Sequence, residues 1–247
     1  MIEPSAQELA IYDDISKLGE KLWRTSTAIK GLSTDPKMFS IMLYKRLLSN
    51  QRGYTALWKI NLNLEADIIL RAALEAAICI AANAKLREEF VLLMSRDAAA
   101  TIQGQIKVHR DNEAHDLVRE GEATLRFLKG RLPAGVKPAT LIWKELAEKG
   151  EVPQLYSFHK TLSGVSSHVT GLSILRGVTN ESMDSAQREI SGLERKMHLM
   201  MMAGAMLQGA RLHSVMIEAR AELEIAIALT DRLATVSKSW PGVGQND

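Results

Sequence analysis

The sequence contains little cysteine, proline or aromatic side chain. Its 247 residues include one cysteine, six prolines and four each of Phe, Tyr and Trp. A single cysteine cannot form a disulfide within the chain or a thiolate zinc cluster. Cys79 lies in an apolar run, where it is expected to act as a small buried hydrophobic residue. Runs rich in Ala, Leu, Glu, Lys and Met dominate instead, and they favour helix over strand. The sequence therefore predicts an all-α protein.

The sequence also lacks an excess of either positive or negative charge, and it lacks a long uninterrupted apolar run. There are 31 Lys plus Arg and 29 Asp plus Glu, so the net charge of +2 gives no strong field for nucleic acid or an anionic membrane. The most apolar stretch, 197–216, contains His198, Gln208, Arg211 and His213. A membrane span of ~20 residues would not readily bury those four groups. Because the chain does not begin with a basic segment and an apolar run, we expect a cytoplasmic protein that is neither secreted nor bound to a membrane.

Several motifs for cofactors and metals are missing. The sequence has no Gly-rich phosphate loop ending in Gly-Lys-Ser/Thr and no Gly-x-Gly-x-x-Gly. His-Glu-x-x-His is absent, as is the paired Glu-x-x-His pattern of helical di-iron proteins. We therefore expect no cofactor and no metal site. The segment from Gly164 begins like the nucleophile elbow of a hydrolase, but His168 replaces the second glycine and the segment lies within a helical pattern.

Apolar spacing predicts one domain over residues 1–237, folded as a single bundle of about seven to nine helices. Segment 86–130 is more polar than the others, which is typical of an exposed or interfacial helix, with a break at Gly104. The last helix would have ~54 residues and span ~80 Å, so we expect a kink or break near Gly204 or Gly209. The expected helices cover residues 6–31, 36–50, 54–84, 86–130, 139–149, 153–176 and 185–237, followed by a flexible tail at 238–247.

The first polar feature is a pair of charges on the predicted central helix. Arg71 and Glu75 are four residues apart, so both side chains leave the helix on one side and can form an ion pair. Their neighbours are strongly apolar, and an unpaired buried charge costs several kcal/mol. The pair is then either an exposed salt bridge, which contributes about 0.3 to 0.5 kcal/mol, or part of a partly buried site with further partners.

A later helix carries hydroxyls and imidazoles. His168 shares a face with small and apolar residues, where a neighbouring helix can approach closely at Gly164. Two explanations stay open for this helix: a hydrogen-bonded core histidine beside a seam of small residues, or a polar site. Another side of the helix forms a polar edge made of Tyr156, His159, Ser163, Ser166, Ser167 and Thr170.

The two helices share a recognisable pattern. An Arg-Gly step precedes the central helix, which carries Arg-x-x-x-Glu, and the later helix carries a Tyr and ends with Ser-His. The residues concerned are Arg52, Gly53, Arg71, Glu75, Tyr156, Ser167 and His168. This pattern resembles a widespread group of uncharacterised bacterial all-helical proteins, over roughly residues 50 to 175. The resemblance implies that the Arg71, Glu75, Tyr156 and His168 side chains meet in the folded bundle as one polar site.

The segment Arg110 to His115 places an arginine and a histidine five positions apart. This spacing is similar to the Arg, polar residue, spacer, His motif of the HEPN superfamily, helical bundles that include dimeric, metal-independent ribonucleases of prokaryotic defence and toxin systems. The resemblance implies that His115 moves the proton of an RNA 2′-hydroxyl while Arg110 stabilises charge on phosphorus. An exposed, charged helix face is the alternative explanation.

Three functional hypotheses follow. The first is a protein that acts by binding a partner protein, or through the polar site around Arg71. The second is a HEPN-like ribonuclease that binds RNA and uses Arg110 and His115, and the third is a structural subunit of a larger assembly. Methionines can fill core gaps or form an adaptable surface, so pairing of two last helices is our hypothesis for a homodimer. The methionines concerned are Met197, Met200, Met201, Met202, Met206 and Met216.

Overall fold

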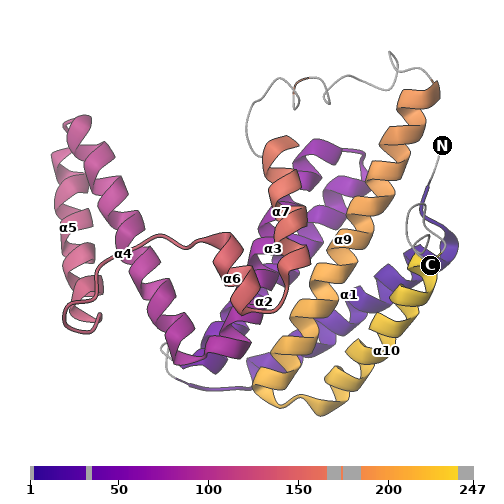
Figure 1. Cartoon of the computed structure of the whole chain (residues 1–247), viewed down its shortest axis with the longest axis horizontal. Helices are drawn as coiled ribbons and strands as arrows, with labels where there is room; N and C mark the ends of the chain where they lie inside the picture. The colour runs from indigo at the N-terminus through magenta and orange to yellow at the C-terminus, as the bar shows by residue number, and fades with distance from the viewer. Residues whose placement is uncertain (1–2, 32–34, 166–173, 175–184, 239–247) are drawn as a thin grey trace.

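The computed structural model describes residues 3–31, 35–165, 174 and 185–238. Every regular element in these residues is an α-helix, which confirms the predicted all-α bundle. The sequence features predicted beyond them, including Ser167, His168 and the tail from 239 onward, lie outside the described residues. The helices are α1 (Ala6–Thr27), α2 (Pro36–Lys59), α3 (Asn63–Leu86), α4 (Glu88–Asp111), α5 (His115–Gly130), α6 (Trp143–Lys149), α7 (Pro153–Val165), α9 (Ser185–Ile217) and α10 (Arg220–Ser237), labelled as in Figure 1.

The first two helices begin where the sequence indicates. The Ser5 hydroxyl accepts a hydrogen bond from the Glu8 N–H at 3.2 Å, and the Glu8 carboxylate accepts one from the Ser5 N–H at 2.6 Å. This reciprocal cap satisfies two donors that have no partner inside a helix. Asp35 caps α2 by accepting from the Lys37 N–H at 2.7 Å, and Pro36 occupies the first helical position. Both caps use residue types that favour the start of a helix.

The predicted break at Gly104 and the predicted kink or break near Gly204 or Gly209 are misplaced, because both segments are interrupted at other positions. Gly53 lies inside α2 and Gly104 inside α4, while α9 continues as a helix through both Gly204 and Gly209. The predicted helices 54–84, 86–130 and 185–237 are each interrupted by a turn without glycine. The chain reverses at non-glycine residues with positive φ, namely Asn61 (63°), Glu113 (55°) and Glu218 (63°). Glutamate is uncommon in the left-handed region, which is why local sequence did not reveal the turns at Glu113 and Glu218.

Gly209 has a packing role instead. A β-carbon at this position would overlap the side chain of Leu47 on α2 and approach Ile80 of α3 to 3.4 Å. Because glycine has no side chain, α9 lies close against both helices at this point. The glycine therefore marks a close approach of three helices rather than a helix end.

Helix α3 lies at the centre of the bundle, in contact with α2, α6, α7 and α9 (Figure 1). Cys79 is buried within it, and burial raises the pKa of its thiol to about 12, as expected for a core filler. Helix α9 is also central, and four of its methionines are buried: Met200, Met202, Met206 and Met216. Most of the methionine stripe therefore packs in the core, while Met197 is 44% exposed, and the pairing of two copies of this helix stays a prediction. No described helix is both long and apolar enough to cross a membrane.

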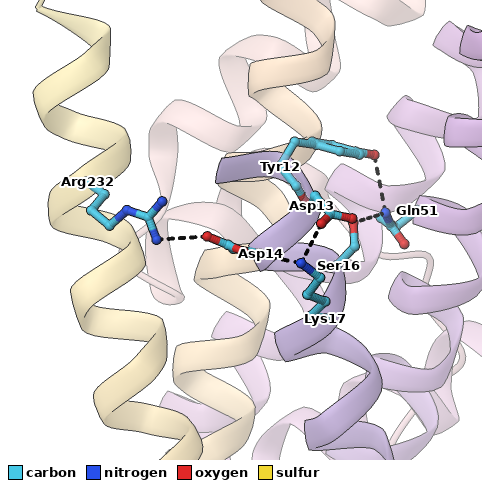
Figure 2. A network of polar contacts seen from close by, with 7 residues as sticks. All are labelled: Tyr12, Asp13, Asp14, Ser16, Lys17, Gln51 and Arg232. Carbon is cyan, nitrogen blue, oxygen red and sulfur yellow. Dashed lines mark hydrogen bonds and ion pairs between the residues drawn. The ribbon is translucent and has the colours of Figure 1, made fainter. Parts of the chain in front are cut away.

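Polar contacts hold α1 against α2 and α10, as Figure 2 shows. On one side of α1, the Gln51 amide donates to the Ser16 hydroxyl at 2.8 Å and lies 3.4 Å from the Tyr12 hydroxyl. Burial raises the pKa of Tyr12, so this phenol stays protonated at neutral pH. On the other side, Arg232 of α10 donates to the Asp14 carboxylate at 2.9 Å. These contacts fix three helices relative to one another, and we assign them a structural role.

Candidate functional site

Three charged side chains follow one another along the otherwise apolar α3. Asp67, Arg71 and Glu75 are spaced by four residues, so they form a stripe on one side of the helix. Helices α7 and α9 both pack against α3, and each supplies polar partners to this stripe. We call these three residues and their partners the α3 polar seam. It comprises Asp67, Arg71 and Glu75 of α3, His159 and Ser163 of α7, and His198 of α9.

Arg71 contacts one seam residue on its own helix and one on α7. Its Nη2 atom lies 3.1 Å from Glu75 Oε1, and its Nε donates to the Ser163 hydroxyl at 2.9 Å. Ser163 uses its own proton toward the His159 carbonyl at 2.7 Å, so its oxygen is free to accept from Arg71. Both charged side chains are partly buried, at 29% and 22% exposure. The Arg71 and Glu75 pair is therefore not an isolated surface salt bridge.

His159 is one of two fully buried members of the seam, the other being Asp67. His159 is 5% exposed, and its Nε2 lies 3.0 Å from Glu75 Oε1. A carboxylate only accepts hydrogen bonds, so Nε2 carries a proton and Nδ1 is the bare nitrogen when the ring is neutral. Among the described residues Nδ1 has no hydrogen-bond partner. The rings of Trp143 and Tyr156 lie beside the imidazole, with centroids 5.6 and 6.1 Å away.

The other end of the seam is a second pairing of carboxylate with imidazole. Asp67 is 2% exposed, and its Oδ1 lies 2.6 Å from Nδ1 of His198 on α9. Asp67 is not among the site residues predicted from the sequence. The available signal was its position four residues before Arg71, which extends the charged pair into a stripe of three on an apolar helix. Its partner on α9 could not be found this way, because the two residues are 131 positions apart in the chain.

The structure thus places some of the predicted site residues together and leaves others undescribed. Arg71, Glu75 and His159 share one hydrogen-bonded group. Tyr156 adjoins that group through its ring, which stacks on the His159 imidazole at an interplanar angle of 27°. Ser167 and His168 lie outside the described residues, so the implied meeting of His168 with Arg71 stays a prediction.

The geometry of the seam argues against its two imidazoles acting on one substrate atom. Their carboxylate partners, Asp67 and Glu75, are eight residues apart on one helix, which corresponds to about 12 Å at ~1.5 Å per residue. General acid and base catalysis at one atom needs both groups within hydrogen-bond reach of it, directly or through one water. Among the described residues, no group of three His, Cys, Asp or Glu side chains could hold a metal ion. The contacts of the seam instead join α7 and α9 to α3.

Arg110 and His115 lie at a different place, the tip where α4 turns into α5. Both side chains are exposed, and Arg110 Nη2 lies 3.2 Å from Glu122 of α5. His115 is the first residue of α5. The pair is therefore not in the α3 polar seam, so the two sites inferred from sequence are separate in the fold.

The most distinctive surface is the pair of helices α4 and α5, which projects from the bundle like an arm (Figure 1). The two helices pack closely, because a β-carbon on Gly121 would lie 2.7 Å from the side chain of Ile106. Yet α5 has no buried residue, and the outer part of α4 buries only Ala99 and Ile106. The polar character predicted for 86–130 as an exposed or interfacial segment agrees with this placement.

One flank of α5 carries apolar side chains that face solvent. Leu117 is 48% exposed and Phe127 is 63% exposed. At about 100° of rotation per residue, these two side chains and those between them at Glu120 and Thr124 fall within an arc of about 80°. Arg131 follows on the same side, with its guanidinium 5.3 Å from the centre of the Phe127 ring. We call these five residues the α5 flank.

A hollow of about 370 Å³ lies where the arm joins the bundle. Side chains of α2 and α4 form one part of it, and the end of α5 with the following loop forms the rest. Its walls are mostly apolar, and they include Phe39, Val91, Leu92, Leu128 and Pro133.

Comparisons with protein-family models, with curated proteins and with solved structures found no match to this chain. The resemblances to uncharacterised bacterial proteins and to the HEPN superfamily therefore stay predictions from sequence.

Proposed function

We propose that this protein acts by binding another protein through the arm formed by α4 and α5. The observation that carries the proposal is the α5 flank, where Leu117 and Phe127 face solvent on a helix that buries nothing. Helices in globular proteins gain most of their stability by packing an apolar face against other elements. An arm with one covered face and a second apolar flank has the form of a docking element.

The physical driving force is the removal of this apolar surface from water, at about 25 cal/mol per Å². Aromatic side chains such as Phe127 supply large contact areas at protein interfaces and often contribute most of the binding energy. The charges on the arm are balanced, because residues 99–130 contain five Lys or Arg and five Asp or Glu. A nearly neutral arm does not attract the phosphates of a nucleic acid over long range, which favours a protein partner.

The α3 polar seam supports this proposal by its own chemistry. The carboxylate, guanidinium and hydroxyl groups of Glu75, Arg71 and Ser163 bind to one another and to His159. Groups that already satisfy each other would have to break these contacts to hold a ligand. We assign the seam to fixing α7 and α9 on α3, and the arm to binding.

The proposal is tested by photo-crosslinking in cells. A photoreactive amino acid replaces Thr124, in the middle of the α5 flank, in the full chain. The control carries the same amino acid at Ala228, an exposed position on α10. We expect a covalent adduct from position 124 and none from position 228. If position 124 gives no adduct, or both positions give the same adducts, the arm is not a docking element.

A further inference from the structure

We propose that the partner is a second copy of this chain, and that the two α5 helices pack against each other in antiparallel orientation. This inference rests on the proposed function of the arm and names its occupant. It follows from the order of charges and apolar side chains along α5, since that order is complementary to itself when reversed.

Charge is segregated along α5 and its two ends. Residues 113–122 contain four acidic side chains and one basic one, whereas residues 123–131 contain three basic side chains and no acidic one. Acids near the start of a helix and bases near its end also favour the helix dipole. The dipole does not explain why Leu117 and Phe127 are exposed on the same flank. Of these charges, Glu113, Glu120 and Arg131 lie at or beside the α5 flank. Glu122, Arg126 and Lys129 lie on other sides of the helix at about 100° per residue, and Glu122 is paired with Arg110 of α4.

An antiparallel pair centred near residue 122 brings these features into register. In a two-fold dimer, residue i of one chain faces residue j of the other, and j faces i in return. With this centre, Leu117 faces the Phe127 position of the second copy, and Glu113 faces the Arg131 position. A parallel pair would instead place Glu113 beside Glu113 and Arg131 beside Arg131, which is unfavourable. The sequence of α5 therefore fits a second copy in one orientation only.

The position of the arm permits this contact. In Figure 1 α5 is the outermost helix, with α4 between it and the rest of the bundle. Two such arms would form a four-helix arrangement around the two α5 flanks. Each copy would supply its own Leu117 and Phe127 to the contact. This differs from the predicted pairing of the last helices, where four of the methionines are buried in the core of each copy.

The first test measures mass by light scattering on the purified full chain at micromolar concentration. We expect about twice the mass of one 27.3 kDa chain. A variant with Leu117→Asp and Phe127→Asp is expected to give the mass of one chain with an unchanged circular dichroism spectrum, because both side chains face solvent. The matched control is Ile227→Asp on α10, where the side chain is 45% exposed, and it should stay dimeric. A parent of one chain mass overturns the inference, as does a dimer that survives the double substitution.

The second test measures orientation with engineered cysteines. Cys79 is buried, so a cysteine placed at Leu117 or Phe127 is the reactive one. An antiparallel pair brings position 117 of one copy to position 127 of the other. Equal mixtures of Leu117→Cys and Phe127→Cys proteins should therefore form a disulfide dimer under mild oxidation. Each variant alone should form little, because its own two cysteines would be about 15 Å apart and a disulfide needs about 4.4 to 6.8 Å between Cα atoms.

The outcomes separate this inference from the proposed function. If each cysteine variant crosslinks with itself as well as in the mixture, the pairing is not antiparallel and the inference fails. If the adduct at position 124 contains a different protein and the parent has the mass of one chain, the arm binds a partner other than itself. In that case the proposed function stands, and the inference that the partner is a second copy is wrong. If no adduct forms and the parent is a monomer, both are wrong.

Discussion

Acid is expected to destabilise this protein through one buried histidine, His213 of α9. Its side chain lies between two hydroxyls, with Nε2 2.8 Å from the Ser26 oxygen and Nδ1 2.8 Å from the Ser40 oxygen. The ring stacks on Tyr44 with centroids 4.5 Å apart. Ser26 donates its own proton to the Leu22 carbonyl, so it accepts from Nε2–H. Nδ1 then accepts from Ser40, and the neutral ring satisfies both of its nitrogens.

The sign of the pH effect follows from this arrangement. Burial lowers the pKa of His213 from 6.5 to about 3. The unfolded chain therefore takes up this proton at a higher pH than the folded chain does. The neutral ring contributes its full stability above pH ~6.5, and that stability is lost as pH falls toward the folded pKa.

The expected magnitude is about 1.4 kcal/mol per pH unit once the pH is below the unfolded pKa. Between pH 6.5 and 4.5 the free energy of unfolding should fall by about 2 kcal/mol because of this residue alone. That is a large share of the total for a domain whose stability is about 5 to 15 kcal/mol.

The assay is urea denaturation of the parent and of His213→Gln at several pH values from 7 to 4.5. Glutamine can donate and accept at similar positions but does not titrate, so its stability should fall about 2 kcal/mol less over this range. The comparison uses only the slope against pH, since loss of the stack on Tyr44 lowers stability at every pH. Equal slopes in the two proteins would refute the reasoning. So would an NMR titration that shows His213 in the folded parent becoming protonated near pH 6.5.

Three further predictions concern the seam, the core and the arm tip. Glu75→Ala should lower the free energy of unfolding by about 2 kcal/mol, because it leaves the buried His159 nitrogen without its acceptor; an unchanged urea midpoint would contradict the proposed role of the seam. Gly209→Ala should destabilise by about 1 to 3 kcal/mol through overlap with its neighbours, whereas Gly104→Ala, in open space on α4, should stabilise by about 0.5 to 1 kcal/mol. Opposite signs in thermal melting would support the packing argument, and equal signs would not. Finally, the purified protein should leave single-stranded RNA intact in the presence of EDTA, since Arg110 is paired with Glu122; cleavage that is lost in a folded His115→Ala protein would favour the ribonuclease hypothesis instead.

The helical class and the first helix starts were accessible from the sequence because they depend on local interactions. Ser5 and Asp35 cap the helices that follow them through residues two and three positions away. The turns at Glu113 and Glu218 were not accessible, because glutamate has no local preference for the left-handed region. Gly209, which looked like a break, is instead needed where helices approach closely.

The candidate site divides in the same way. The spacing of Arg71 and Glu75 alone indicates that they share one side of a helix, and the polar edge that includes His159 was visible on its own helix. That Glu75 meets His159, 84 positions later, depends on how α7 packs on α3.

By itself, the sequence determined which segments are helical, where the first ones start and which polar side chains lie on one side of a helix, because these properties depend on residues within about one turn. Only the tertiary structure decided which faces are covered. Leu117 and Phe127 look like the apolar face of any amphipathic helix until α5 is placed at the outer edge of the arm, where they meet solvent. Burial depends on contacts between distant parts of the chain, and no local pattern encodes those contacts.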